Sequence, residues 1–140
     1  RRKGSSMSTN AYNAYKTAGI GTADPITLTT MLYDGALKAI KKARICALEG
    51  NRERFLDETQ RAHLIIGELL ATLDHEKGGE LADRMSAIYA YCIRCIIQAS
   101  IGDLAKLDEA ETHMARIAEA WKQAAKTVRV RPATAQGAVA

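Results

Sequence analysis

The apolar run Met85–Ile101, MSAIYAYCIRCIIQASI, constrains the fold of this chain more than any other stretch. It is too long for a typical strand of about 4–8 residues and favours a helix. In a helix, one face carries an apolar stripe at spacings of three and four. The stripe consists of Met85, Ile88, Tyr89, Cys92, Ile93 and Ile96, and it leaves Tyr91, Cys95 and Ile97 outside it. Such a helix must be covered on more than one side, so we expect some apolar surface to stay uncovered in a chain of 140 residues.

The composition favours a bundle of helices. Hydrophobic residues make up 47% of the chain but aromatic residues only 5%, and alanine, leucine and isoleucine dominate. This usage is typical of helix bundles rather than β-sandwiches or barrels, and the length fits one domain with a real core.

The N-terminal residues lack helical periodicity. We expect residues 1–6 to be a non-native remnant preceding the start at Met7. Residues 7–24 are rich in Gly, Ser, Thr and Asn but carry Tyr12, Tyr15 and Ile20. Two interpretations stay open: an unstructured leader, or a strap whose apolar side chains dock on the bundle.

Capping signals divide the remaining chain into four helices. Asp24 and Pro25 fit the first cap and the first helical position, and Gly50 fits the end of a helix reaching about Glu49. The second helix is expected from Asn51 to Leu73 or Asp74, and DHEKGG (74–79) is expected to be a polar break. The third helix is expected over 80–101, and the fourth from an N-cap at Asp103 to about Lys126.

Regular apolar seams support this division. The seam of the second helix is Phe55, Thr59, Ala62, Ile66, Leu69 and Leu73, and that of the fourth is Leu107, Ala110, Met114, Ile117, Trp121 and Ala124. Short connections make sequential helices antiparallel neighbours. The sequence thus predicts an all-α, antiparallel up-and-down four-helix bundle over residues 25–127, with an irregular N-terminal leader and a disordered C-terminal tail over 128–140.

Charge and cysteine usage exclude several classes of function. The formal net charge is +4, but Arg1–Lys3, Arg129 and Arg131 supply five positive charges, which leaves −1 for residues 4–128. Nucleic-acid binding is therefore not expected. No apolar run is long enough to insert into a membrane, and three cysteines within apolar helical runs fit a reducing compartment, so we expect a cytoplasmic protein.

The sequence gives no support for an enzyme, a cofactor or a metal site. Cys92 and Cys95 lie deep within a helix, where core packing is expected rather than redox chemistry. His63, His75 and His113 have no metal-ligand spacing, and no phosphate-binding glycine loop occurs. A phosphotransfer module using His63 or His113 is a weak alternative.

Two blocks of sequence resemble a known family. Ala23–Ala43 reads ADPITLTTMLYDGALKAIKKA, and Leu69–Ile96 reads LLATLDHEKGGELADRMSAIYAYCIRCI. Together with the tyrosine-bearing NAYNAYKTAGI (10–20) and Trp121 near the end, they resemble the flagellar secretion chaperones for flagellin (FliS-type). The Cys92–Cys95 pair and the tail after residue 128 depart from the family pattern.

The resemblance implies a cytosolic export chaperone that is not an enzyme. It would bind the disordered C-terminal segment of flagellin in a hydrophobic groove, block premature polymerisation and deliver flagellin to the flagellar export gate. The family's leader is thought to cover part of the same surface when flagellin is absent. The alternative is a structural bundle that forms a homodimer through its surplus apolar face.

The candidate partner-binding residues come from the leader, the first helix and the third helix. Tyr12, Tyr15 and Ile20 would form the strap, and Tyr89, Tyr91 and Ile97 are the apolar residues of the third helix that are hardest to place in one seam. The rings of Tyr33, Tyr89 and Tyr91 suit a surface that is wet in one state and dry in another. The candidates are Tyr12, Tyr15, Ile20, Ile26, Leu28, Met31, Leu32, Tyr33, Tyr89, Tyr91 and Ile97.

Overall fold

The structure, a computed structural model, describes residues 24–130, with side chains for residues 24–127. This part of the chain forms four helices: α2 (Pro25–Leu48), α3 (Arg52–Ala71), α4 (His75–Ser100) and α5 (Ala105–Val130). The candidate residues Tyr12, Tyr15 and Ile20, and the tail beyond Val130, lie outside the described residues.

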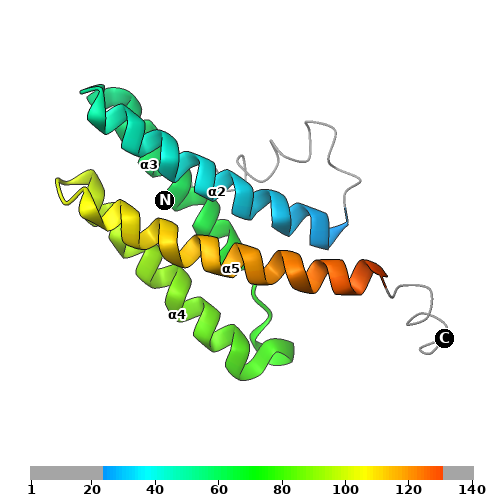
Figure 1. The fold of residues 1–140 in the computed structure, drawn as a ribbon. Helices are drawn as coiled ribbons and strands as arrows, with labels where there is room; N and C mark the ends of the chain where they lie inside the picture. Colours follow the sequence, from blue (N-terminus) through cyan, green and yellow to red (C-terminus); the bar gives the residue numbers. More distant parts are fainter. Residues whose placement is uncertain (1–23, 131–140) are drawn as a thin grey trace, which may run out of the picture.

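The four helices form one up-and-down bundle (Figure 1). Connections of three or four residues join consecutive helices, which run antiparallel because such short loops reverse the chain direction. Each helix packs against the next, and α5 packs back against α2. The predicted all-α four-helix bundle is confirmed.

Several helix ends follow from the predicted caps. The Asp24 side chain accepts a hydrogen bond from the Thr27 backbone N–H at 2.7 Å. Gly50 has a φ of +74°, the left-handed conformation that ends α2, and Asn51 then caps α3 by accepting from the Arg54 N–H at 3.2 Å.

The predicted polar break over 74–79 is correct at its end and wrong at its start. A helical turn already begins at His75, because the Asp74 side chain caps it by accepting from the Lys77 N–H at 3.0 Å. Gly79 then interrupts α4 with a non-helical φ of 51° and ψ of −127°. The aspartate cap thus adds one helical turn, and the main part of α4 follows the glycines as predicted.

The other predicted ends differ from the structure by a few residues. Helix α3 ends at Ala71, before the predicted Leu73. Helix α5 begins at Ala105, two residues after the predicted cap Asp103, whose backbone carbonyl accepts from the Lys106 N–H at 3.0 Å. It then continues to Val130, past the predicted end at Lys126.

The core contains most of the predicted seams, with two errors. Cys95 was placed outside the stripe of its helix but is 1% exposed, because α4 also packs against α5 on the side that carries Tyr91. Ala124 was placed in the seam of α5 but is exposed. The N-terminal half of α4 diverges from α5 (Figure 1), so the last turns of α5 have less cover. Leu81 near the start of α4 is 64% exposed for the same reason.

Candidate partner-binding groove

Three of the candidate residues are core residues. Leu32, Tyr33 and Tyr89 are each at most 2% exposed. The hydroxyl groups of Tyr33 on α2 and Tyr89 on α4 hydrogen bond to each other, and the Tyr33 ring also packs 6.2 Å from the ring of Trp121 on α5. Burial raises the pKa of both tyrosines. The expectation that they lie on a surface is wrong, because each hydroxyl satisfies the other and so permits full burial.

Tyr91 occupies a half-buried position between α4 and α5. Its hydroxyl donates a hydrogen bond to the Glu109 carboxylate, to which the Lys106 ammonium also donates at 3.0 Å. The hydrogen bond from Tyr91 has the largest effect on Glu109 and lowers its pKa, and the hydrogen bond from Lys106 lowers it further. His113 contacts the Tyr91 ring edge-on at 5.6 Å, and the Arg94 guanidinium lies 5.6 Å from the ring centroid. The ring edge and one face are thus already engaged within the bundle.

The remaining candidates do not form one surface. Ile26, Leu28 and Met31 are half-buried in the first turns of α2. Ile97 is 45% exposed near the end of α4, at the opposite end of the antiparallel bundle. The structure therefore separates the candidates on α2 from Ile97.

Ile97 lies in a groove between α3 and α4. This groove, called the α3–α4 groove below, has a volume of about 260 Å³ and is lined by Leu56, Thr59, Gln60, His63, Ile96, Ile97 and Ser100. Leu56 faces Ile97 from α3 and is 39% exposed. Leu56 was missed as a site residue, although its position beside the regular seam of α3 was the available signal.

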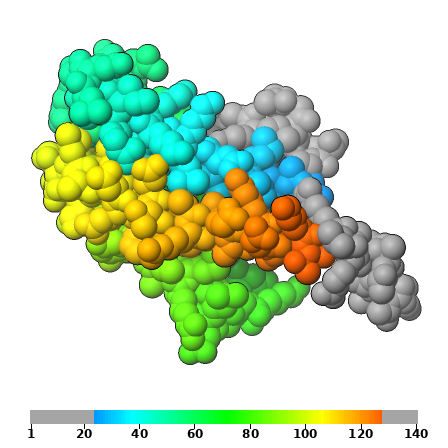
Figure 2. Space-filling view, in the orientation of Figure 1, coloured from blue at the N-terminus to red at the C-terminus, as the bar shows by residue number. Residues whose placement is uncertain are grey.

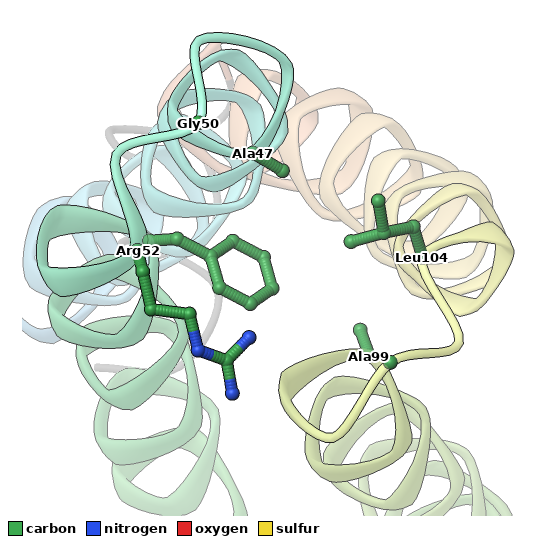
Figure 3. Close-up of a pocket in the computed structure, with 7 residues that line it drawn as sticks. Ala47, Gly50, Arg52, Ala99 and Leu104 are labelled. Carbon is green, nitrogen blue, oxygen red and sulfur yellow. The ribbon is translucent and has the colours of Figure 1, made fainter.

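A second pocket adjoins the groove at the end of the bundle where the α2–α3 and α4–α5 loops lie (Figure 3). This loop-end pocket has a volume of about 230 Å³, and its lining is Ala47, Gly50, Arg52, Phe55, Ala99, Gly102 and Leu104. Both hollows are lined by residues of α3 and α4: Phe55 and Ala99 line the pocket, and Leu56 and Ser100 line the groove.

Arg52 bridges the two helices between these hollows. Its guanidinium lies 5.8 Å from the Phe55 ring centroid, and Nη2 donates to the Ser100 backbone carbonyl at 3.3 Å. Figure 3 shows this side chain reaching from α3 toward α4, opposite Ala99. The site therefore offers two hollows of mixed polar and apolar lining, and Arg52 places one positive charge in the wall of the loop-end pocket.

Neither hollow contains groups arranged for catalysis. Within residues 24–130, no three His, Cys, Asp or Glu side chains could hold a metal ion together. The three thiols are buried, and burial raises the pKa of Cys92 to about 12, which keeps it a neutral thiol. His63 lines the groove, but the described residues give it no hydrogen-bonded carboxylate that would orient it as a base.

No helix in the described part of the chain has the length and apolar character needed to cross a membrane.

Comparison with known proteins assigns the family. The model of the family described as "Flagellar protein FliS" matches residues 8–128. A flagellar secretion chaperone FliS of Bacillus subtilis is 38% identical over 121 residues, covering 86% of this chain and 90% of the relative. The Salmonella typhimurium protein of the same name is 38% identical over 108 residues, covering 76% and 80%. One from Campylobacter jejuni is 32% identical over 114 residues, covering 81% and 89%. The chain belongs to the FliS family of flagellar secretion chaperones.

Proposed function

We propose that this protein is a cytoplasmic chaperone that binds the disordered C-terminal segment of flagellin and delivers flagellin to the flagellar export gate. The observation that carries the proposal is the α3–α4 groove, with the loop-end pocket lined by the same two helices. In a bundle of this family, Leu56 and Ile97 remain 39% and 45% exposed on the facing walls of this groove.

The size of the hollows fits apolar side chains of a peptide. At about 260 and 230 Å³, both lie below the range of about 300–1,000 Å³ typical of small-molecule pockets. An amphipathic helix that lays its apolar face into a groove anchors itself through a few such side chains. Occupying both hollows would cover the apolar residues by which the segment could otherwise associate with another flagellin.

The energetics favour reversible binding. Burying on the order of 1,000 Å² of apolar surface gives roughly 25 kcal/mol of gross transfer free energy. Ordering a disordered segment and losing its free motion cancel most of that gain. A moderate affinity suits a chaperone that must release its cargo at the export gate without a chemical energy source.

The leader is proposed to compete with flagellin. Tyr12, Tyr15 and Ile20 would dock on the same apolar surface and reduce the population that is competent to bind. Removing residues 1–15 should then raise the affinity for flagellin or leave it unchanged. A large loss of affinity would instead make the leader part of the binding surface.

We choose the proposed contact residues by how far each side chain is exposed to solvent. Ile97 is the central contact, with Leu56 opposite it. Ile26, Leu28, Met31 and Tyr91 are half-buried and remain candidates for a longer bound segment. The buried Leu32, Tyr33 and Tyr89 would act only by shaping the bundle beneath.

The proposal is tested by measuring the binding of a fluorescent peptide comprising the last few dozen residues of flagellin. Ile97→Asp should weaken binding by at least about tenfold, because a charge would be desolvated in the groove. Leu81→Asp is the matched control: it is the same change on the same helix, at a residue that is 64% exposed outside the groove.

Two outcomes would contradict the proposal. One is equal binding of full-length flagellin and of flagellin lacking the peptide region. The other is self-association of the chain that depends on Ile97 and persists with flagellin present, which would favour the homodimer.

A further inference from the structure

The outer face of α2 carries a stripe that the α3–α4 groove does not include. Lys38, Lys41, Ile45 and Leu48 follow one another at spacings of three, four and three, which places them along one face of the helix. All four are exposed, Ile45 by 53% and Leu48 by 79%. These four residues are called the α2 stripe below. Figure 2 shows the face of the molecule on which α2 and α5 lie side by side.

The apolar end of the stripe borders a hollow between α2 and α5. This hollow has a volume of about 180 Å³ and is lined by Arg44, Ala47, Leu48, Leu104, Ala105, Leu107 and Asp108. Leu48 and the 45% exposed Leu104 are large apolar side chains at its walls. A large apolar side chain of a partner could therefore insert beside Leu48.

The basic end of the stripe has no acidic partner within the described residues. Three neighbouring carboxylates are engaged elsewhere: Asp108 and Glu111 pair with Arg44, and Asp34 pairs with Lys122. The exposed Glu49 lies beyond Leu48 at the apolar end of the stripe, eight residues from Lys41. Lys38 and Lys41 take part in no ion pair of the described residues, and Lys42 beside them adds a third exposed ammonium. The stripe thus presents uncompensated positive charge followed by apolar surface.

We propose that the α2 stripe docks an amphipathic helical segment of a second partner protein, one that carries acidic residues at one end and large apolar residues at the other. Lys38 and Leu48 are ten residues apart, which is about 15 Å along a helix, so three turns of a partner helix would span the stripe. The complementary charge would supply orientation, and the apolar contacts would supply most of the affinity.

A second copy of this chain fits the stripe less well than an acidic partner. In a two-fold dimer the same patch faces itself. With the stripes antiparallel, Lys38 and Lys41 would face Ile45 and Leu48 of the copy, and only Glu49 beyond Leu48 would bring a carboxylate near the three exposed lysines. With the stripes parallel, lysines would face lysines.

A lipid surface also fits less well. Membrane-surface helices carry an apolar face along their length with cations beside it. Here the cationic and apolar residues are segregated along the helix axis instead.

The test uses a fluorescent designed helical peptide of about four turns with two leucines one turn apart, followed by two glutamates one turn apart. The wild-type protein should bind it, and Lys38→Glu with Lys41→Glu should weaken binding at least about tenfold at low salt. A peptide with lysines in place of the glutamates should bind the charge-reversed variant more tightly than the wild-type protein. Leu48→Asp should weaken the binding of both peptides.

The outcomes separate this proposal from the flagellin proposal. Binding that Ile97→Asp abolishes, or that the flagellin segment displaces, would place the peptide in the α3–α4 groove and overturn the α2 stripe. Peptide binding that is insensitive to the charge reversal would also overturn it. So would dimerisation that Leu48→Asp abolishes, or binding to anionic phospholipid vesicles that exceeds binding to the acidic peptide.

Discussion

Two seams of this bundle, between α2 and α5 and between α3 and α4, are built from different side chains. Polar contacts cross the α2–α5 seam along its length. Arg44 binds two carboxylates of α5 near one end, and near the other end α5 donates to α2 from Lys122 and from the Trp121 indole. The contacts are Arg44–Asp108, Arg44–Glu111, Lys122–Asp34 and Trp121–Thr30.

The α3–α4 seam has one side-chain hydrogen bond across it within the described residues, from Arg52 to the Ser100 carbonyl. Elsewhere along its outer edge, Leu56 and Ile97 stand apart at the walls of a groove. The polar contacts between α2 and α5 are exposed or partly buried, and they fix how these two helices lie against each other. The exposed Leu56 and Ile97 can instead accept an apolar side chain of suitable shape. We therefore expect side-chain contacts across the α2–α5 seam to contribute to stability, and the outer edge of the α3–α4 seam to be available for a partner.

The largest effect is expected from Trp121→Ala. The ring packs on Tyr33, and Nε1 donates to Thr30 Oγ1 at 2.9 Å. Removing both should lower the free energy of unfolding by about 2–4 kcal/mol, somewhat less than for a fully buried aromatic residue. Urea denaturation followed by circular dichroism measures this. Trp121→Phe should recover most of the loss, and a loss below about 1 kcal/mol for the alanine variant would contradict the structural role of this seam.

Stability at alkaline pH tests the effect of the buried Cys92 thiol and Tyr89 hydroxyl on folding. Burial raises the pKa of Cys92 from 9.0 to about 12, and burial also raises the pKa of Tyr89. The folded state favours the neutral thiol, so its contribution is fully present below pH 9 and is lost as the pH rises toward 12.

Denaturation at pH 8 and at intervals up to pH 10.5 should therefore show falling stability, by up to about 1.4 kcal/mol per pH unit for each such group. Cys92→Ala should reduce the slope between stability and pH. An unchanged slope in this variant would show that Cys92 does not contribute.

Removing the Arg44 ion pairs should have a smaller effect. The guanidinium is about one-third exposed and contacts both Asp108 and Glu111, so solvent and salt screen it in part. Arg44→Ala should cost about 1 kcal/mol at low ionic strength and less at high salt. Arg84→Ala is a control, because the exposed Arg84–Glu80 pair lies within α4 rather than across a seam. Equal salt dependence in the two variants would weaken the assignment of Arg44 to the seam.

The sequence predicted the helices and most of the core because periodicity and caps are local signals. Asp24 and Gly50 were each identified from neighbours within a few residues, and the predicted helix start at Asn51 is one residue from the observed start at Arg52. The partner-binding residues were less predictable because exposure depends on which helix faces which. Tyr33 and Tyr89 are 56 residues apart in sequence, and their mutual hydrogen bond could not be inferred from either stripe alone.

The same limit explains why Leu56 was missed while Ile97 was identified. Both sit beside a regular seam, but only Ile97 belongs to a run so apolar that some of its residues must remain uncovered. The groove exists because α3 and α4 pack through Phe55, Thr59 and Ile96 beneath it, a pairing that the sequence of either helix does not specify.

The smallest effect on stability is expected at the groove itself. Because Leu56 and Ile97 are 39% and 45% exposed, Leu56→Ala and Ile97→Ala should each change the free energy of unfolding by less than about 1 kcal/mol. The double variant should nevertheless weaken binding of the flagellin segment by about tenfold or more, since groove anchors act mainly in the complex. Measuring denaturation and peptide binding on the same preparations separates the two quantities. A stability loss as large as that of Trp121→Ala would show that the α3–α4 seam also holds the bundle together, and the contrast between the seams would then fail.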